Sequence, residues 1–382
     1  MKKELKSKKF KFIPVNKPLI TKEDISYLNK SISKGWISSE GPEVKKFEND
    51  FSNFIGHKYS VAVSSGTAAL EIAIKSLKLK KGDEVIIPNF TIISNAIAVL
   101  KENLNIKLID CNIKDWNMNI SEVKKKITKK TKAIIATHIY NFPLRVDILK
   151  KICNKNKIIL IEDAAEAIGQ KLNNKLCGSF GDISIFSFYA NKQITTGEGG
   201  MITTNNKKLF EKSKSLRNLC FGKKDRFNHE DIGWNYRMTN LQASLGVSQL
   251  KRIKSIVHKR HLVGKEYFQR LKYNKNIYIP ETSRNYAKNI YWVIAFVITN
   301  KNLNIDAKKM MKKLITYVIQ TRPFFWPMHK QKIFKEKYKI NTSGNYKNSE
   351  YISKYGLYLP SSLDIKSNQI KFICDKVNSI LK

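Results

Sequence analysis

The strongest constraint on the fold is an alternation of short apolar runs with amphipathic stretches through roughly the first 210 residues. Amphipathic stretches such as Ala68–Leu79 and Val146–Asn156 have the length and pattern of helices. Such alternation predicts an α/β fold in which helices flank a mostly parallel, seven-stranded sheet. The candidate strands are Tyr59–Ser64, Glu84–Pro88, Asn105–Asp110, Ala133–His138, Ile158–Asp163, Ile183–Tyr189 and Gly200–Thr204.

The pattern changes after about residue 206, where a longer helical stretch runs through Gln242–Leu271. Ile290–Thr299 then reads as a strand, Ala307–Leu314 as a helix and Tyr317–Arg322 as another strand. A chain of 382 residues has room for two domains. We predict a large α/β domain over residues 1–255, N-terminal segment included, and a smaller α+β domain over residues 256–382, with the boundary between 206 and 290.

The charge is high but spread out. Lys and Arg number 71 against 31 Asp and Glu, a formal net charge of +40, and the lysines run from Lys2 to Lys382. A nucleic-acid-binding protein would gather them on one face or in a motif. We therefore expect a solvated, Lys-rich surface and no nucleic-acid partner, although a positive field attracts phosphorylated small molecules.

Cysteine spacing and hydropathy narrow the class of protein further. The five cysteines are widely spaced and form no CxxC pair, so neither a disulfide framework nor a metal site is expected. No apolar run approaches the roughly 18 residues of a membrane span. We expect a cytoplasmic protein that does not contact membranes.

Three segments with chemical potential follow candidate strands, where open α/β sheets bind ligands. Ser64–Leu70 joins small residues to a helix start, which suits a helix cap or a phosphate site. Glu162–Ala167 places acidic residues at a strand end, as a cap or as site carboxylates. Ser187–Gly200 contains Lys192 before a threonine pair and a glycine cluster, without the GxxxxGK[ST] pattern of a P-loop.

A phosphate cradle, a carboxylate and a lysine together are the set that pyridoxal phosphate (PLP) needs. Its phosphate suits a helix N-terminus, and a carboxylate keeps its pyridine nitrogen protonated, which makes the ring an electron sink. Its aldehyde forms a Schiff base with a lysine. The three segments together therefore predict a PLP site.

Eight blocks of the sequence resemble the DegT/DnrJ/EryC1/StrS family of PLP-dependent sugar aminotransferases, over roughly residues 12 to 380. The resemblance implies the aspartate aminotransferase-like fold (PLP fold type I), a homodimer with shared active sites, and a PLP cofactor that passes through the pyridoxamine form. The blocks are Trp36–Gly41, Ser65–Leu70, Asp163–Ala167, Gly178–Asp182, Phe186–Lys192, Ile194–Met201, Asn235–Gln242 and Thr321–His329.

The resemblance also implies roles for individual residues. Lys192 would form the Schiff base and then carry the proton between cofactor and substrate carbons, while Asp163 would pair with the pyridine nitrogen. For the phosphate, the implied donors are the backbone of Gly66 and Thr67, the Ser187 hydroxyl and, from the neighbouring subunit, Asn235.

Two positions depart from the family's usual pattern. Ile92 stands where many relatives carry an aromatic residue over the cofactor ring, and Phe90 would replace it only if the loop were shifted. Glu166 stands where many relatives carry His or Gln, near the cofactor's 3-oxygen. Because an anion there would repel a phenolate, we expect Glu166 to be protonated or turned aside.

For substrates, the blocks Trp36–Gly41 and Thr321–His329 are most similar to those of GDP-perosamine synthases. That implies an aminotransferase acting on a GDP-linked 4-keto-6-deoxymannose with glutamate as donor. The implied substrate-binding residues are Trp36, Arg237, Arg322 and His329.

Three alternatives stay open beside this reading. One is a dTDP- or UDP-linked, or a 3-keto, acceptor in the same reaction. Another is a family dehydratase, against which Lys192 argues because those relatives carry His at that position. The last is a regulatory protein, against which the intact Lys192, Asp163 and Ser187 argue.

Overall fold

The computed structural model describes residues 11–222, 224–338, 340 and 342–382. A seven-stranded sheet dominates it, with strand order β1-β9-β8-β5-β4-β2-β3. All neighbours pair in parallel except β9, which runs antiparallel to both β1 and β8. The strands are β1 (Tyr59–Val63), β2 (Glu84–Pro88), β3 (Asn105–Ile109), β4 (Thr131–Thr137), β5 (Ile159–Asp163), β8 (Ile183–Ser187) and β9 (Gly200–Thr204).

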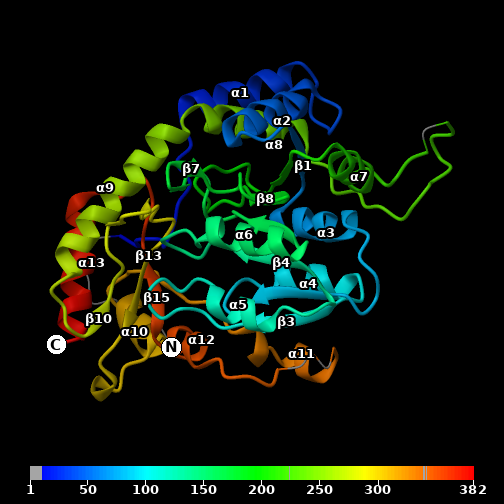
Figure 1. Cartoon of the computed structure of the whole chain (residues 1–382). Helices are drawn as coiled ribbons and strands as arrows, with labels where there is room; N and C mark the ends of the chain where they lie inside the picture. The colour runs from blue at the N-terminus through cyan, green and yellow to red at the C-terminus, as the bar shows by residue number, and fades with distance from the viewer. Residues whose placement is uncertain (1–10, 223, 339, 341) are drawn as a thin grey trace.

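Helices cover both faces of this sheet (Figure 1) because side chains alternate between the two sides of each strand. Ala62 packs against one helical layer and Val61 and Val63 against the other. The first layer contains α2 (Pro42–Ile55), α5 (Ile120–Lys126), α6 (Val146–Asn156) and α8 (Asn240–Lys251), with α1 (Lys22–Ser33) against α8; the second contains α3 (Gly66–Ser76), α4 (Ser94–Lys101) and α7 (Lys207–Arg217).

A second, antiparallel sheet forms the centre of the C-terminal part, with strand order β10-β13-β15-β14. Its strands are β10 (Ile277–Tyr278), β13 (Ile294–Ile298), β14 (Arg322–Pro323) and β15 (Gly356–Leu359). One face packs on α9 (Ile253–Leu271), α10 (Ala307–Ile315) and α13 (Ser367–Ile380). The remaining elements are short: the hairpins β6 (Lys171–Leu172)–β7 (Lys175–Leu176) and β11 (Ser283–Arg284)–β12 (Ala287–Lys288), η1 (Lys301–Leu303), η2 (Met328–Lys330), α11 (Lys332–Glu336) and α12 (Lys347–Tyr355).

An aromatic cluster joins the two sheets. Phe90, Trp116 and Tyr140 from the large sheet side meet Trp292 and Phe324 from the small one. Phe90 is fully buried in this cluster, so it is not available to cover a cofactor ring.

The predicted architecture is confirmed, with three local corrections. The predicted strand Tyr317–Arg322 is wrong over most of its length: Val318 has a left-handed φ of 59°, and Ile319 makes only an isolated bridge to Ile13. The helical stretch Gln242–Leu271 is two helices that meet at Arg252. Of the predicted strand Ile290–Thr299, only Ile294–Ile298 is a strand.

Residues from each of the two predicted domains pack against the core of the other. Ile13 packs into the C-terminal core, whereas Met328, Phe334 and Tyr346 pack against the α3–α4 face of the large sheet. The boundary at 255/256, which falls inside α9, stays a prediction.

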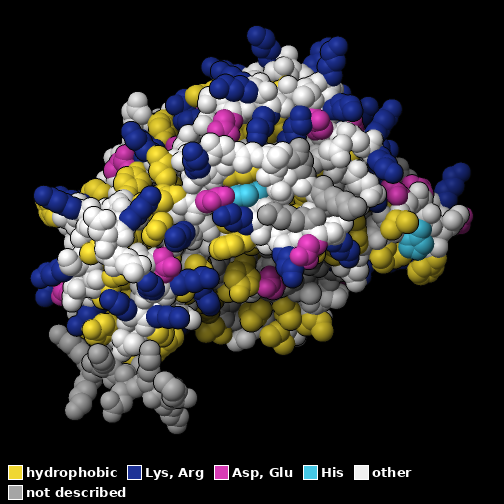
Figure 2. Space-filling model, turned by 90° about the horizontal axis from the view of Figure 1, so that it is seen from below, with side chains coloured by type: hydrophobic (Ala, Val, Ile, Leu, Met, Phe, Trp, Pro, Cys, Tyr) yellow, Lys and Arg dark blue, Asp and Glu magenta, His cyan; other side chains and the backbone are white. Residues whose placement is uncertain are grey.

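The distribution of surface charge and the hydropathy of the helices bear on whether the protein binds nucleic acid or crosses a membrane. On the face shown in Figure 2, Lys and Arg side chains are scattered among neutral and apolar ones instead of forming one continuous patch. Among the residues that the structure describes, no helix is long and apolar enough to cross a membrane.

Candidate active site

The candidate site is a cavity of about 370 Å³ at the carboxyl ends of the large sheet's parallel strands. Residues from five separate strand ends or following loops line it, as the sheet topology predicts for an open α/β fold. Seven of the predicted site residues lie on its wall: Gly66, Thr67, Ile92, Asp163, Glu166, Ser187 and Lys192.

The start of α3 forms one end of the cavity. The Ser65 hydroxyl caps the helix by accepting from the Ala68 N–H at 3.1 Å. A Cβ added to Gly66 would lie 2.9 Å from the Ser187 Cβ, so only glycine lets the helix start approach β8 this closely. The Thr67 hydroxyl is 2.8 Å from that of Ser94. Backbone N–H groups and the hydroxyls of Ser65, Thr67 and Ser94 therefore lie together at a helix N-terminus. This is a set of groups that suits a phosphate.

Asp163 ends β5 and is fully buried beneath the cavity floor. Its Oδ1 accepts from the Ala165 N–H at 3.2 Å, and its Oδ2 lies 3.4 Å from the Thr137 hydroxyl. Burial raises the pKa of its carboxyl. A cationic ring nitrogen placed beside it would stabilise the charged form, so Asp163 is suited to pair with a pyridinium.

Lys192 lies in the loop after β8, and its buried amine faces the same cavity. Its Nζ is 3.9 Å from the centre of the Trp292 ring and 4.0 Å from the Glu166 Oε1. Burial lowers the pKa of this amine. An amine that loses its proton more readily is a better nucleophile toward an aldehyde.

Glu166 is also buried against the cavity, and burial raises the pKa of its carboxyl to about 8. Its Oε2 accepts from the Tyr140 N–H at 2.9 Å. The expectation that this carboxyl is protonated or turned aside stays a prediction.

The sequence did not indicate the C-terminal wall of the cavity, formed by Trp292 and Tyr358 together with Phe325. Trp292 donates from Nε1 to the Asn191 carbonyl oxygen at 2.9 Å and stacks on Tyr140, which also stacks on Phe325. Tyr358 pairs across the small sheet with Arg322. Strand position predicts the residues of the large sheet, but it gives no information on which distant aromatics close the cavity.

The predicted substrate residues are dispersed. Arg322 is exposed and, as the partner of Tyr358, shares the sheet face that looks toward the cavity. His329 is buried elsewhere: its Nδ1 is 3.1 Å from the Asn89 Oδ1, its Nε2 is 2.9 Å from the Glu350 Oε1, and its ring stacks on Tyr346.

Three other predicted residues lie outside the cavity lining. Trp36 is exposed before α2. Asn235 and Arg237 lie between α7 and α8, in the segment that follows an arm (residues 219–222 and 224–233). The Arg237 Nη1 donates to the Asn218 Oδ1 at 2.6 Å. That segment runs beside the end of β1, where the Ser64 N–H donates to the Tyr236 carbonyl oxygen.

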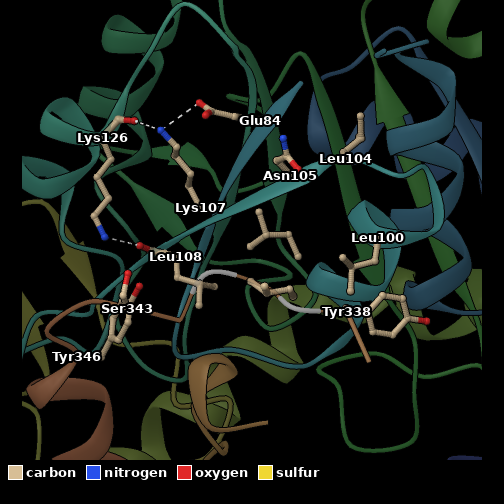
Figure 3. Close-up of a pocket in the computed structure, with 12 residues that line it drawn as sticks. Glu84, Leu100, Leu104, Asn105, Lys107, Leu108, Lys126, Tyr338, Ser343 and Tyr346 are labelled. Carbon is tan, nitrogen blue, oxygen red and sulfur yellow. Dashed lines mark hydrogen bonds and ion pairs between the residues drawn. The ribbon is translucent and has the colours of Figure 1, made fainter. Parts of the chain in front are cut away.

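A second cavity, of about 570 Å³, lies along the edge strand β3 (Figure 3). Its charged groups already have partners: the Lys107 Nζ is 3.1 Å from the Glu84 Oε2, and the Lys126 Nζ donates to the Leu108 carbonyl oxygen at 2.8 Å. These paired groups make it a poorer candidate for catalysis than the cavity at the strand ends.

A buried group resembling a metal site lies behind Asp163, formed by His138, Glu162 and Cys177. Glu162 already accepts hydrogen bonds from His138 and from three backbone N–H groups, those of Gly178, Phe180 and Gly181. Burial also raises the pKa of the Cys177 thiol well above its usual value. The Glu162 carboxylate of this cluster therefore serves to hold the Gly178–Gly181 turn in place.

The donor set of the strand-end cavity fits PLP. The close approach of Gly66 to Ser187 leaves a cradle that a single methyl group would fill, and the buried Thr91 hydroxyl on the wall has no partner among the described residues. The fold together with a buried lysine, a buried aspartate and this cradle defines a fold type I PLP-dependent enzyme.

Comparisons with known proteins identify the family. The profile of the DegT/DnrJ/EryC1/StrS aminotransferase family matches residues 18–378. The chain is 33% identical to a GDP-perosamine synthase of Escherichia coli O157:H7 and 34% identical to one of Vibrio cholerae, each over 96% of this chain and 98% of the relative. Helicobacter pylori PseC, an aminotransferase of pseudoaminic acid biosynthesis, has the same fold, with a TM-score of 0.91, 24% identity and coverage of 97% and 99% of the two chains.

The chain therefore belongs to the DegT/DnrJ/EryC1/StrS aminotransferase family. It is a PLP-dependent aminotransferase.

Proposed function

We propose that the protein transfers an amino group from glutamate to a GDP-linked 4-keto-6-deoxyhexose, with GDP-4-keto-6-deoxymannose as the acceptor of choice. The product is the 4-amino-4,6-dideoxy sugar. The observation that carries the proposal is the meeting of Lys192, Asp163 and the Gly66–Thr67 helix start in one cavity. The two GDP-perosamine synthases of 33% and 34% identity support the acceptor.

PLP supplies the electron sink that makes carbon–hydrogen bonds next to the amino group acidic. In the proposal, the Lys192 Nζ would carry that proton between the substrate carbon and the cofactor carbon that flank the transferred nitrogen, in both half-reactions. Asp163 keeps a proton on the ring nitrogen. The N–H groups of Gly66 and Thr67 and the Ser187 hydroxyl would hold the phosphate, and Ile92 would pack against the ring.

Arg322 is the residue we propose for the acceptor's diphosphate. It is exposed beside Tyr358 on the cavity wall, and its planar guanidinium matches phosphate oxygens. Arg237 remains a second candidate anchor and Trp36 a candidate edge of the sugar pocket. His329 was predicted as a further substrate-binding residue, but both of its ring nitrogens are engaged by Asn89 and Glu350.

We further propose a homodimer with shared sites, located in the cytoplasm. On the cavity wall, Ile92 is 44% exposed and Tyr189 is 48% exposed, which is a large apolar exposure beside a binding site. The arm between α7 and α8 extends away from the rest of the chain (Figure 1) and carries the exposed Phe227 and Ile232. A second copy would cover these surfaces and would bring Asn235 to the partner's phosphate.

The dimer is tested by mixing two inactive variants, Lys192→Ala and Asn235→Ala, under conditions in which hybrids form. If each site takes Lys192 from one subunit and Asn235 from the other, hybrids have one intact site and regain activity. Hybrids shown to form without any rescue would contradict shared sites.

The substrate is tested with a panel of nucleotide-linked 4-keto and 3-keto sugars and glutamate, with product mass as the readout. We expect amination of the GDP-linked 4-keto sugar, with weaker turnover of the dTDP and UDP analogues. Preference for a 3-keto sugar or another nucleotide would replace the proposed acceptor, loss of a hydroxyl without amination would indicate a dehydratase, and no turnover of any sugar would favour a regulatory role.

A further inference from the structure

Both the side chain and the backbone of Glu166 are held by hydrogen bonds. Its Oε2 accepts from the Tyr140 N–H at 2.9 Å, and Tyr140 holds a left-handed φ of 56°, which is uncommon for a bulky residue. The Gln193 Nε2 donates to the Glu166 carbonyl oxygen at 2.6 Å. Gln193, the residue next to Lys192, is thus hydrogen-bonded to the backbone of Glu166. This contact fixes the position of the Lys192 segment relative to Glu166.

The contacts of Tyr140 leave one carboxyl oxygen of Glu166 facing the lysine. The Oε1 lies 4.0 Å from the Lys192 Nζ, and both side chains are largely buried. A small rotation of the lysine chain or one bridging water would complete a hydrogen bond. Among the described residues, the other titratable groups facing the pair are Asp163, Tyr140 and Tyr358.

The charges of this group restrict where protons can lie. In the proposed function Asp163 stays ionised against the ring nitrogen, and the phosphate brings further negative charge. An ionised Glu166 is then compensated only while Lys192 carries its proton. Burial penalises an uncompensated charge, so a neutral lysine requires a neutral Glu166.

We propose that Glu166 is the proton partner of Lys192: it takes the proton that the lysine must lose before its amine can react with the cofactor's aldehyde. The proton leaves Nζ and binds Oε1, so an ion pair becomes a neutral amine and a neutral carboxylic acid, and the net charge of the pair stays zero. The inference rests on the proposed role of Lys192 as the cofactor lysine. Burial raises the pKa of Glu166 and lowers that of Lys192, so it reduces the free-energy cost of moving the proton from the ion pair to the neutral form.

The test measures the titration of Lys192 in the cofactor-free protein. Trace acetylation across neutral and alkaline pH, read by mass spectrometry on the Lys192 peptide, follows the fraction of neutral amine, with the exposed Lys332 as internal reference. The Glu166 anion favours the charged lysine, so Glu166→Gln should lower the pKa of Lys192. We expect Lys192 to become about tenfold more reactive at neutral pH, which corresponds to one pKa unit.

Two further variants make the result specific. Glu166→Asp keeps the charge but moves it away, so its profile should lie between those of the wild type and Glu166→Gln. Glu198→Gln removes another carboxylate from the same cavity wall and should leave the Lys192 profile unchanged. An unaltered profile in a folded Glu166→Gln protein, or an equal shift in Glu198→Gln, would overturn the proposal.

The experiment uses neither cofactor nor sugar, so its failure is distinct from failure of the proposed function. A Lys192 that titrates independently of Glu166 could still be the cofactor lysine. Conversely, if Lys192 and Glu166 titrate together but the protein aminates another sugar, the proton-partner proposal stands and only the proposed acceptor is wrong.

Discussion

The cofactor cavity and the segment Thr321–His329 show opposite relations between sequence and space. The cavity brings together residues as distant as Gly66 and Lys192. The segment separates residues that are almost adjacent: Phe325 faces the cavity, Trp326 is exposed, and His329 is buried against Asn89.

The difference has a physical origin. Parallel strands end at one edge of a sheet, so every loop that follows such an end reaches the same place. A segment with little regular structure has no such rule, and each of its side chains goes where it finds a partner. Position after a strand therefore predicts a site residue far better than chemical type within a short motif.

The largest expected effect is that of Lys192→Ala. The variant should lose both the covalent link to PLP and turnover, because no other amine lies on the cavity wall that the structure describes. Visible absorbance of the purified protein and an amination assay check this. Transamination near the wild-type rate would show that the cavity assignment is wrong.

Asp163→Asn should impair the chemistry more than the fold. Asn keeps a hydrogen-bonding group at the end of β5 but cannot hold the ring nitrogen protonated. Losing electrostatic stabilisation of this kind costs roughly 10²–10³ in kcat, about 3–4 kcal/mol. Steady-state kinetics beside a thermal melt separate the two effects, and an unchanged kcat would mean that another group sets the charge of the ring.

Gly66→Ala tests the phosphate end of the cavity. The new Cβ would lie 2.9 Å from the Ser187 Cβ, so the helix start must move away from β8. Overpacking of this kind costs about 1–3 kcal/mol, and we expect PLP affinity to fall by roughly tenfold or more. A titration of the cofactor-free variant measures this, and wild-type affinity would argue against a tight cradle.

Arg322→Ala and His329→Phe divide the C-terminal segment into a binding part and a structural part. Arg322→Ala should raise KM for the sugar nucleotide by about tenfold, the effect of one lost charged hydrogen bond, while the glutamate half-reaction and the melting temperature stay close to wild type. Equal damage to both half-reactions would remove Arg322 from acceptor binding.

His329→Phe should show the reverse. Phe can keep the stack on Tyr346 but leaves the Asn89 Oδ1 and the Glu350 carboxylate without the imidazole. The Asn89 Oδ1 still accepts from the backbone N–H of residue 329, and Glu350 still pairs with Lys330, so the loss is that of the imidazole's hydrogen bonds, about 0.5–1.5 kcal/mol each in unfolding free energy, with little change in KM. A chemical denaturation curve checks the loss, and a raised KM with unchanged stability would return His329 to the substrate site.

The sequence predicted the large sheet closely. Six of its seven strands lie within one residue of the predicted bounds at their N-terminal ends, and β4, which starts at Thr131 rather than Ala133, is the exception. Apolar runs with a regular face leave few alternatives. The stretch Tyr317–Arg322 has the same composition as a strand, but Ile319 pairs only with Ile13, a contact that nothing local in the sequence encodes.

The site divides in the same way. Asp163 was predictable from its place at the end of β5 and Lys192 from its place after β8, and the resemblance gave them roles. Trp292 and Tyr358 were not, since they reach the cavity only through the packing of the small sheet on the large one. Aromatic residues near apolar strands are typical of any hydrophobic core, so their residue type alone does not indicate a site.

The central claim is that the strand-end cavity is the PLP site and that Lys192 is the residue bound to the cofactor. Borohydride reduction of the purified holoenzyme, followed by peptide mass mapping, tests it directly. The account predicts one reduced cofactor per chain, attached to Lys192. Attachment to any other of the chain's lysines, or none at all in a protein that still transaminates, would contradict it.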